Sequence, residues 1–417
     1  MNRWAAAAAL AAALIAGSAL QAQEPVSGYV TTGVDVVGMP SASSDDAAVE
    51  LRARLFVERL QDFGPRVRVR LAGYVEGLVA DRNTPEPPTT DAVVRPQEVY
   101  LEVHGERADL RVGYTRVVWG RLDELQPTDV VNPLDLTRFF FEGRSEARLP
   151  VALARARLFL PASTVVEALV VPDFRRSRFD QLDEPTSPFN LFAVTKGSDP
   201  FVTRREPDTS WSNLQGGGRV QTTTGRVDWA LSAFHGFKSF GVLVADPTAG
   251  PVESFPRYTM VGGDFETVRG EWGVRGEWAA FIGDTFQAPV ELGALDGRSV
   301  ELGLGVDRRA GTARLSGNVL ARRRSLDDGP VRGFDRTDLN LIGSIDRTFA
   351  RDTRRLQVFG VYDPTEATSF VRAIATVSLS DVLSIEASGG AFLGSGSDTL
   401  GRFADRDFAY LRVRRSF

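Results

Sequence analysis

Apolar and polar residues alternate along much of this chain with a period of two. In the segment 66–77, every second position is valine, leucine or glycine, and the positions between are mostly arginine, tyrosine and glutamate. Segments 300–307 and 383–391 repeat the pattern. An amphipathic helix repeats its apolar positions every three or four residues, so this pattern predicts β-strands with one apolar and one polar face.

The number and length of these segments indicate a membrane barrel. A strand that crosses a bilayer needs roughly 9–11 residues and alternates outward apolar with inward polar side chains. The sequence predicts about eighteen such strands, within a range of about 14 to 18. They are 26–36, 49–60, 66–79, 96–104, 107–118, 150–160, 163–172, 216–222, 225–235, 257–268, 270–282, 298–307, 311–322, 336–349, 353–363, 367–379, 382–392 and 406–417.

The links between these strands alternate in length. Long links such as 37–48 and 80–95 follow every odd-numbered strand, short links such as 61–65 follow every even-numbered one, and 364–366 is an exception. Outer-membrane barrels have long external loops and short periplasmic turns, whereas a soluble β-sandwich or propeller, the alternative, needs no such alternation. We therefore expect an all-β, transmembrane, antiparallel up-and-down barrel with both termini on the periplasmic side.

The start of the chain has the features of an export signal. Arg3 precedes an apolar stretch from Ala5 to Ala16, and small residues lead up to polar Gln23. This order predicts a secretory signal over 1–22, cleaved after Ala22, with a membrane anchor as the alternative. The barrel then occupies 23–417. We expect no plug domain before the first strand, which argues against an energy-coupled receptor.

Composition narrows the choice further. The chain has no cysteine, which excludes disulfides and thiol chemistry. Its net charge of −5 is dispersed along the chain, which argues against nucleic acid as a partner. Of 49 basic residues only Lys196 and Lys238 are lysines. Arginine suits a lumen, because its planar fork stays charged and pairs with carboxylates.

The sequence offers little catalytic chemistry. His104 and His235 each lie near a strand end, without the spacing of a metal site. No G-x-S-x-G element, Walker motif or dinucleotide fingerprint is present. We therefore expect no metal, no cofactor and no enzymatic activity, with a barrel enzyme built on one of the histidines as the less favoured alternative.

The segment 119–149, the third external link, departs from the strand pattern. It contains Phe139, Phe140 and Phe141, which would be costly in a solvated loop. Asn132-Pro133 marks a turn, and 135–141 could form a short helix. In general porins the third loop folds into the barrel and narrows it, and we expect the same here.

Charges on both sides of this loop suggest how it would act. The inward faces of neighbouring strands carry arginines, and the loop carries acids, including Asp123, Glu124, Glu142 and Glu146. An arginine wall facing an acidic loop would select ions by its field, and an anion preference is one expectation. The alternative is that these charges pair and plug the lumen. The predicted lumen and constriction residues are Arg52, Arg54, Arg66, Arg68, Arg70, Arg111, Arg155, Arg157, Trp119, Arg121, Asp123, Asp129, Asn132 and Asp135.

A second long external loop, 173–215, is rich in aromatic residues. It could form a lid or binding surface, or its aromatics could pack it against the barrel rim. These are Phe174, Phe179, Phe189, Phe192, Phe201 and Trp211.

Two motifs carry a resemblance. Arg111-x-Gly113-x-x-x-Val117-x-Trp119-Gly120 followed by Asn132-Pro133-x-Asp135 resembles an R-x-G-x-x-x-V-x-W-G … N-P-x-D pattern. That pattern belongs to a largely uncharacterised family of porin-like proteobacterial outer-membrane proteins, and the resemblance covers about 97–160. The terminal Phe417 resembles the signature that the barrel-assembly machinery recognises, although Arg415 departs from it.

We therefore expect an integral protein of the Gram-negative outer membrane, exported through the periplasm. Its expected function is a porin-like channel for passive diffusion of small solutes. The alternatives are a specific barrel for an apolar solute or for a partner envelope transporter, a barrel enzyme, and a structural barrel with a closed lumen. The expected partners are outer-membrane lipid and lipopolysaccharide, a small solute, the barrel-assembly machinery and, as in many porins, two further copies in a homotrimer.

Overall fold

The computed structural model describes residues 26–38, 47–81, 88–137, 139–178, 203–289, 292–395, 398, 400–404 and 406–417. The predicted signal 1–22 lies outside the described residues, as do Phe179, Phe189, Phe192 and Phe201 of the predicted loop 173–215.

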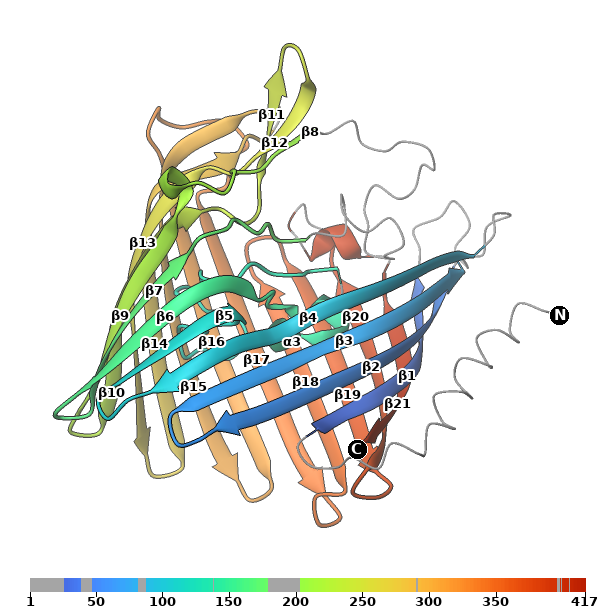
Figure 1. Ribbon diagram of the computed structural model, residues 1–417. Helices are drawn as coiled ribbons and strands as arrows, with labels where there is room; N and C mark the ends of the chain where they lie inside the picture. The colour runs from blue at the N-terminus through green and yellow to red at the C-terminus, as the bar shows by residue number, and fades with distance from the viewer. Residues whose placement is uncertain are drawn as a thin grey trace.

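Eighteen strands form one closed antiparallel sheet (Figure 1). Each strand pairs with the next one in the wall, and β1 pairs with β21 from Tyr29↔Ser416 to Val37↔Phe408, which closes the barrel. The predicted eighteen-stranded antiparallel barrel is confirmed. Its strands are β1 (Val26–Gly38), β2 (Ala47–Phe63), β3 (Val67–Asp81), β4 (Thr89–His104), β5 (Ala108–Thr115), β6 (Val151–Leu160), β7 (Thr164–Val171), β9 (Gln215–Thr224), β10 (Val227–Phe237), β13 (Arg257–Arg269), β14 (Trp272–Gln287), β15 (Ala294–Ala310), β16 (Ala313–Leu326), β17 (Thr337–Phe349), β18 (Arg354–Asp363), β19 (Thr368–Ser378), β20 (Leu383–Leu393) and β21 (Phe408–Ser416).

The two faces of the sheet meet different surroundings, as the alternation predicts. In β15, Leu302 is 57% exposed on the outer surface, whereas its neighbour Glu301, which points inward, is 7% exposed. The outer surface is apolar over much of its area, which suits contact with lipid. A closed sheet also has no free edge, so its backbone groups are paired as a bilayer requires.

The two ends of the barrel differ. Short turns close the end at which the C-terminus lies, and longer links stand at the other end (Figure 1). Gly270 and Gly311 lie in such turns with φ of 61°, a left-handed conformation that suits tight hairpins. The link between β18 and β19 is short although it lies at the loop end, as the sequence indicated.

A small sheet in the external loops was not predicted. It consists of β8 (Thr203–Arg205), β11 (Val242–Asp246) and β12 (Gly250–Ser254). Ion pairs Arg204–Glu253 at 3.1 Å and Arg205–Asp246 at 3.2 Å hold β8 against the hairpin. These strands are three to five residues long, too short for their alternation to be recognised in the sequence.

Helical structure in the described residues is limited to four short pieces. They are α2 (Phe139–Glu142), α3 (Arg144–Ala147), and the 3₁₀ turns η1 (Trp211–Asn213) and η2 (Gly401–Phe403). The predicted helix over 135–141 thus begins later than expected. Within the described part of the chain, no helix has the length and apolar character needed to cross a membrane.

Candidate pore constriction

The chain leaves the barrel wall after β5 and returns to it at β6. The residues between, 116–137 and 139–149, are called the crossing segment here. Its first arm precedes Asn132, and its second arm follows Asn132. Asn132 joins its two arms: the side-chain oxygen of Asn132 accepts a hydrogen bond from the Val117 N–H at 2.7 Å, and its side-chain nitrogen donates to the Leu149 carbonyl at 2.7 Å. Asn132 therefore fixes where the segment leaves and re-enters the wall.

Trp119 anchors the first arm. Its ring is 2% exposed and packs edge-to-face on Phe234 of β10, with centroids 6.4 Å apart. Its Nε1 donates to Glu167 of β7 at 2.8 Å. A Cβ added at Gly217 of β9 would lie 3.0 Å from the Trp119 ring, so glycine at this position leaves room for the indole. The surrounding buried cluster joins the segment to β6, β7, β10, β13 and β14.

Glu277 of β14 organises the next turn of the segment. Its buried carboxylate accepts hydrogen bonds from the N–H groups of Arg121 at 3.0 Å, Leu122 at 3.4 Å and Thr128 at 2.7 Å. Gly120 has φ of 90°, and a Cβ there would lie 2.5 Å from the carboxylate. Glycine after Trp119 therefore lets the backbone approach the Glu277 carboxylate more closely than any larger residue would permit.

Ion pairs bind the same arm to β13 and β14 on this side of the barrel. Arg121 pairs with Asp264 at 2.7 Å and with Glu266 at 3.0 Å, both on β13. Asp123 pairs with Arg275 of β14 at 2.7 Å. The carboxylates and guanidinium of the wall point inward, so these contacts place the arm inside the barrel.

The second arm contacts the other side of the barrel. The buried pair Asp129–Arg148, at 2.7 Å, holds the two arms together. Asp135 then pairs with Arg178 at 2.9 Å and contacts Arg95 of β4.

Phe141 anchors the end of this arm in an aromatic cluster on the wall. Its ring packs on Phe408 with centroids 4.6 Å apart and on Tyr410 at 6.2 Å. Arg372 of β19 donates to the Phe141 carbonyl at 2.5 Å and to the Tyr410 hydroxyl at 2.7 Å. The crossing segment contacts β7 and β13–β16 on one side and β2, β4, β19 and β21 on the other, so it spans the interior.

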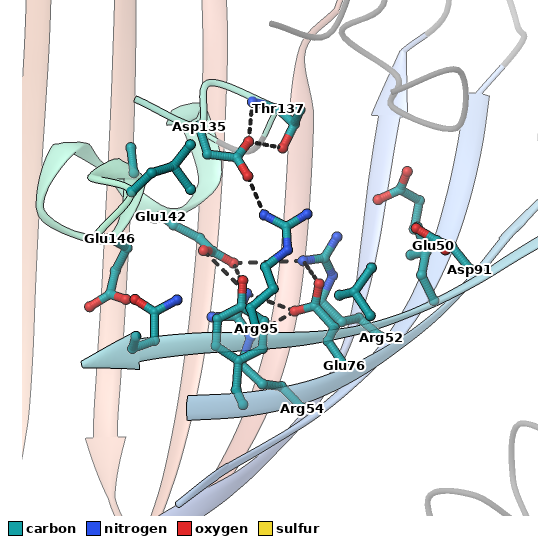
Figure 2. Close-up of a pocket in the computed structure, with 16 residues that line it drawn as sticks. Glu50, Arg52, Arg54, Glu76, Asp91, Arg95, Asp135, Thr137, Glu142 and Glu146 are labelled. Atoms are coloured by element: carbon teal, nitrogen blue, oxygen red, sulfur yellow. Dashed lines mark hydrogen bonds and ion pairs between the residues drawn. The ribbon is translucent and has the colours of Figure 1, made fainter. Parts of the chain in front are cut away.

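Part of the predicted arginine wall faces the segment (Figure 2). Arg54 of β2 pairs with Glu142 of α2 at 3.0 Å and with Glu76 of β3 at 2.7 Å. Arg52 pairs with Glu76 at 2.9 Å and lies 3.7 Å from Glu142. Two guanidinium groups and two carboxylates thus form one network that links the wall to the segment.

The remaining predicted arginines do not contact the segment's acids in the described contacts. Arg66 lies in the turn after β2 and is exposed, and Arg68 pairs with Asp62 beside that turn. The others pair with acids that lie directly or diagonally opposite them on neighbouring strands. These pairs are Arg70–Glu58, Arg70–Glu98, Arg111–Glu102, Arg155–Glu167 and Arg157–Asp109.

The sequence analysis missed Arg95 because it began that strand at residue 96. Ala72 pairs with Glu98 and Gly73 pairs with Pro96, which leaves Gln97 unopposed in a β-bulge. A bulge reverses which residues face inward. Only a change in the parity of the alternation near Pro96 could have revealed it.

Two cavities lie on either side of the crossing segment. The smaller, about 60 Å³, lies between β2–β4 and the second arm, and includes Arg52, Arg54 and Arg95 (Figure 2). The larger, about 750 Å³, lies between the first arm and β13–β17. Among the described strand pairs, register shifts occur at two places, and each borders one of these cavities: Gln97 the smaller, Asp284 the larger. Bulges are common beside functional sites because they re-aim side chains.

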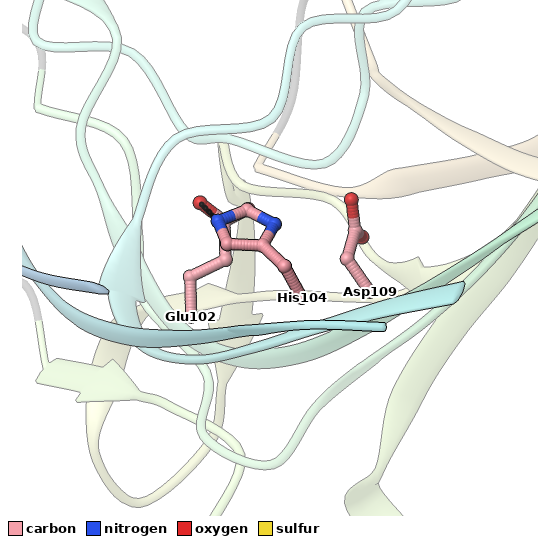
Figure 3. A group of neighbouring side chains, drawn as sticks. All are labelled: Glu102, His104 and Asp109. Atoms are coloured by element: carbon pink, nitrogen blue, oxygen red, sulfur yellow. Dashed lines mark ion pairs between the residues drawn. The ribbon is translucent and has the colours of Figure 1, made fainter. Parts of the chain in front are cut away.

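The structure brings His104 to two acids that the sequence analysis did not connect (Figure 3). Ligand atoms of Glu102, His104 and Asp109 lie within 4.8 Å of one another. Arg111 contacts Glu102 at 2.9 Å and Arg157 contacts Asp109 at 2.6 Å. Because both carboxylates already have guanidinium partners, a cation would have to displace them, and we assign no metal here.

A closed antiparallel barrel with an apolar outer surface and a charged interior is an integral outer-membrane protein. The chain belongs to the family described as Protein of unknown function (DUF1302), which matches residues 94–338. No curated protein matches the chain.

Solved outer-membrane proteins share the fold. OpdK of Pseudomonas aeruginosa, solved with vanillate, has a TM-score of 0.53 at 11% identity, over 94% of this chain and 99% of that one. OccK7 (OpdD) of the same species has 0.52 at 9%, over 95% and 99%. OccAB4 of Acinetobacter baumannii has 0.51 at 10%, over 94% and 97%. At such identities these likenesses show the fold alone.

Proposed function

We propose that the protein is a porin-like channel for passive diffusion of small polar solutes, with the crossing segment as its constriction. The observation that carries this proposal is the segment itself, which spans the interior and leaves charged cavities on both sides. Its anchors are the residues of the two sequence motifs: Trp119 and Gly120 at one wall, Asn132 between its arms and Asp135 near the other wall.

Charge selection follows from the lining of the cavities. The smaller cavity is lined by six acidic and three basic residues, and the larger by five acidic and three basic residues. The expected anion preference therefore does not carry over into this proposal. A net acidic lining favours cations, because rings and walls of charged side chains set the selectivity of a pore.

An apolar, lumen-facing patch around Phe139–Phe141 would favour the alternative of a specific barrel for an apolar solute. Phe141 does meet such a patch, but its own ring fills it, together with Phe370, Phe392 and Phe408. The patch therefore favours anchoring of the segment over binding of a solute. Non-enzymatic function, a homotrimer and recognition of Phe417 by the assembly machinery stay predictions.

Single-channel recording of the refolded protein in a planar bilayer tests the channel. We expect stable current steps, and a reversal potential in a KCl gradient that indicates preference for K⁺ over Cl⁻. A barrel that is folded by its heat-modifiable gel shift but carries no current would overturn the open channel and favour a plugged lumen. Sedimentation in detergent separately measures whether three copies associate.

A further inference from the structure

Lys238 places an ammonium group in a site built from three consecutive residues of β14. Its Nζ lies 2.7 Å from the Asp284 carboxylate and donates to the Thr285 carbonyl at 2.6 Å. The same Nζ lies 5.3 Å from the centroid of the Phe286 ring. A carboxylate, a carbonyl oxygen and an aromatic face are the groups that hold a primary ammonium.

The backbone of β14 is shaped to present this site. Ile282 pairs with Arg298 and Asp284 pairs with Gly297, which leaves Gly283 unopposed with φ of 66°. This bulge leaves Ile282 on the outer surface and turns Asp284 inward, where its side chain is buried.

The acceptors are held in place by contacts other than the one to Lys238. The Asp284 carboxylate also accepts hydrogen bonds from the Ser299 hydroxyl at 2.9 Å and from the Thr285 N–H at 2.9 Å. The site therefore keeps its shape when the ammonium leaves, which lowers the cost of binding another one.

This site opens on the larger cavity, whose volume of about 750 Å³ lies in the range of small-molecule sites. Aromatic rings form part of its lining. Tyr258 and Phe281 have centroids 5.7 Å apart, and Phe286 and Phe334 have centroids 5.4 Å apart. Such a lining contacts the flat, apolar part of a solute while the acceptors of β14 hold its charge.

The presence of lysine at position 238 supports exchange of its ammonium for that of a solute. The chain has 49 basic residues, and Lys238 and Lys196 are its only lysines. An ammonium is a compact charge on a flexible stem, unlike the planar fork of arginine that forms most other ion pairs here. Lys238 can therefore move away without disturbing the strand that it contacts.

We propose that the larger cavity binds small solutes that carry both an apolar ring and a primary ammonium group, and that the solute's ammonium takes the place held by Lys238. This deepens the proposed channel function by naming the class of solute. The solute's ring contacts the aromatic lining, and its ammonium binds Asp284 and the Thr285 carbonyl. The displaced Lys238 side chain extends into the cavity, where the other acids lie.

The test is calorimetric titration of the barrel refolded in detergent, which requires no conduction. The probes are 2-phenylethylammonium, 3-phenylpropionate, which has the opposite charge, and butylammonium, which lacks the ring. We expect 2-phenylethylammonium to bind at least about tenfold more tightly than either of the others, since one charge-assisted contact or one buried ring is worth that much. Equal binding of the three probes, or none, overturns the proposal.

Two variants and a matched control locate the site. Lys238→Met removes the competing ammonium, and we expect binding of 2-phenylethylammonium to tighten about tenfold. Asp284→Asn should weaken it by about the same factor. Arg322→Met is the matched control, because it removes a cation of the same cavity whose ion-pair partner is Glu301 of β15. If Arg322→Met tightens binding as much as Lys238→Met, general electrostatics accounts for the effect and the site is wrong.

The same experiments separate this proposal from the channel. A barrel that is silent in the bilayer but binds 2-phenylethylammonium with the expected variant effects refutes the open channel and leaves the site standing. A conducting barrel in which Lys238→Met and Asp284→Asn change neither binding nor its preference among the probes refutes the site and leaves the channel standing.

Discussion

The carboxylate of Glu277 accepts hydrogen bonds from both the backbone N–H and the hydroxyl of Thr128, at 2.7 and 2.8 Å. The same group holds the N–H groups of Arg121 and Leu122. One side chain of the wall therefore substitutes for the secondary structure that the first arm of the crossing segment lacks. Buried N–H groups need acceptors, and here a single carboxylate supplies them.

Glu277→Ala should release this arm. Several N–H groups lose a charged acceptor, and each such bond contributes on the order of 1.5–3 kcal/mol. We expect faster hydrogen exchange at Arg121, Leu122 and Thr128, and a larger single-channel conductance. Glu277→Gln keeps an oxygen acceptor, so its exchange rates and conductance should lie between those of the unaltered protein and those of Glu277→Ala. Glu271→Ala, at an exposed turn, is the matched control. If amide exchange and conductance are the same in Glu277→Ala as in Glu271→Ala, Glu277 does not hold the first arm in place.

The charged network in the smaller cavity should set part of the selectivity. Glu142→Gln removes a negative charge beside Arg52 and Arg54, so the reversal potential should shift toward less preference for K⁺. Arg54→Gln should shift it the opposite way.

Arg68→Gln, which removes a positive charge paired with Asp62 beside the short turn, is the control and should change little. Shifts of the same sign for Glu142→Gln and Arg54→Gln would contradict a constriction at this place. A shift with Arg68→Gln as large as that with Arg54→Gln would instead place the selective region nearer the turns.

Phe141→Ala should loosen the other end of the segment. The ring is buried among Phe408 and Tyr410, and removal of a buried phenylalanine side chain costs about 3–5 kcal/mol when the cavity stays open. Urea unfolding of the barrel in lipid vesicles measures this loss. Phe265→Ala, on the outer surface in contact with lipid, should cost less. Equal losses for the two variants would mean that Phe141 does not anchor the segment.

The barrel could be predicted from the sequence because lipid imposes one rule on every strand. Each strand must present apolar residues outward, so alternation, strand number and the lengths of the links are visible without any knowledge of contacts. Residues 300–307 show this clearly, and their faces in the structure are those predicted. The three short strands of the external sheet lie in the loops outside the barrel wall, so lipid does not impose this rule on them.

The site could be predicted only in part. Trp119, Arg121, Asp123, Asn132 and Asp135 all hold the crossing segment, and the sequence singled them out as an irregular, aromatic and charged stretch. The wall residues that they and Phe141 contact could not be found, because each meets the segment at a sequence distance that no local pattern records. Glu277 holds the Arg121 N–H, Arg95 contacts Asp135, and Arg372 donates to the Phe141 carbonyl. The two bulges were also hidden, since one extra residue only shifts the parity of an alternating run.

The bulge at Gln97 provides a direct test of how β4 forms the smaller cavity. Because the chain has no cysteine, single cysteines can be labelled at chosen positions. A bulky maleimide on Arg95→Cys should reduce the current, whereas the same label on Val94→Cys should not, since Val94 is 77% exposed on the outer surface. Deletion of Gln97 should leave both results as they are, because Pro96 and Glu98 already pair with the consecutive residues Gly73 and Ala72, so the ladder becomes regular without turning Arg95 or Val94. If the deletion exchanges the two results, the strand has shifted its register instead, and Gln97 is not the extra residue of a bulge.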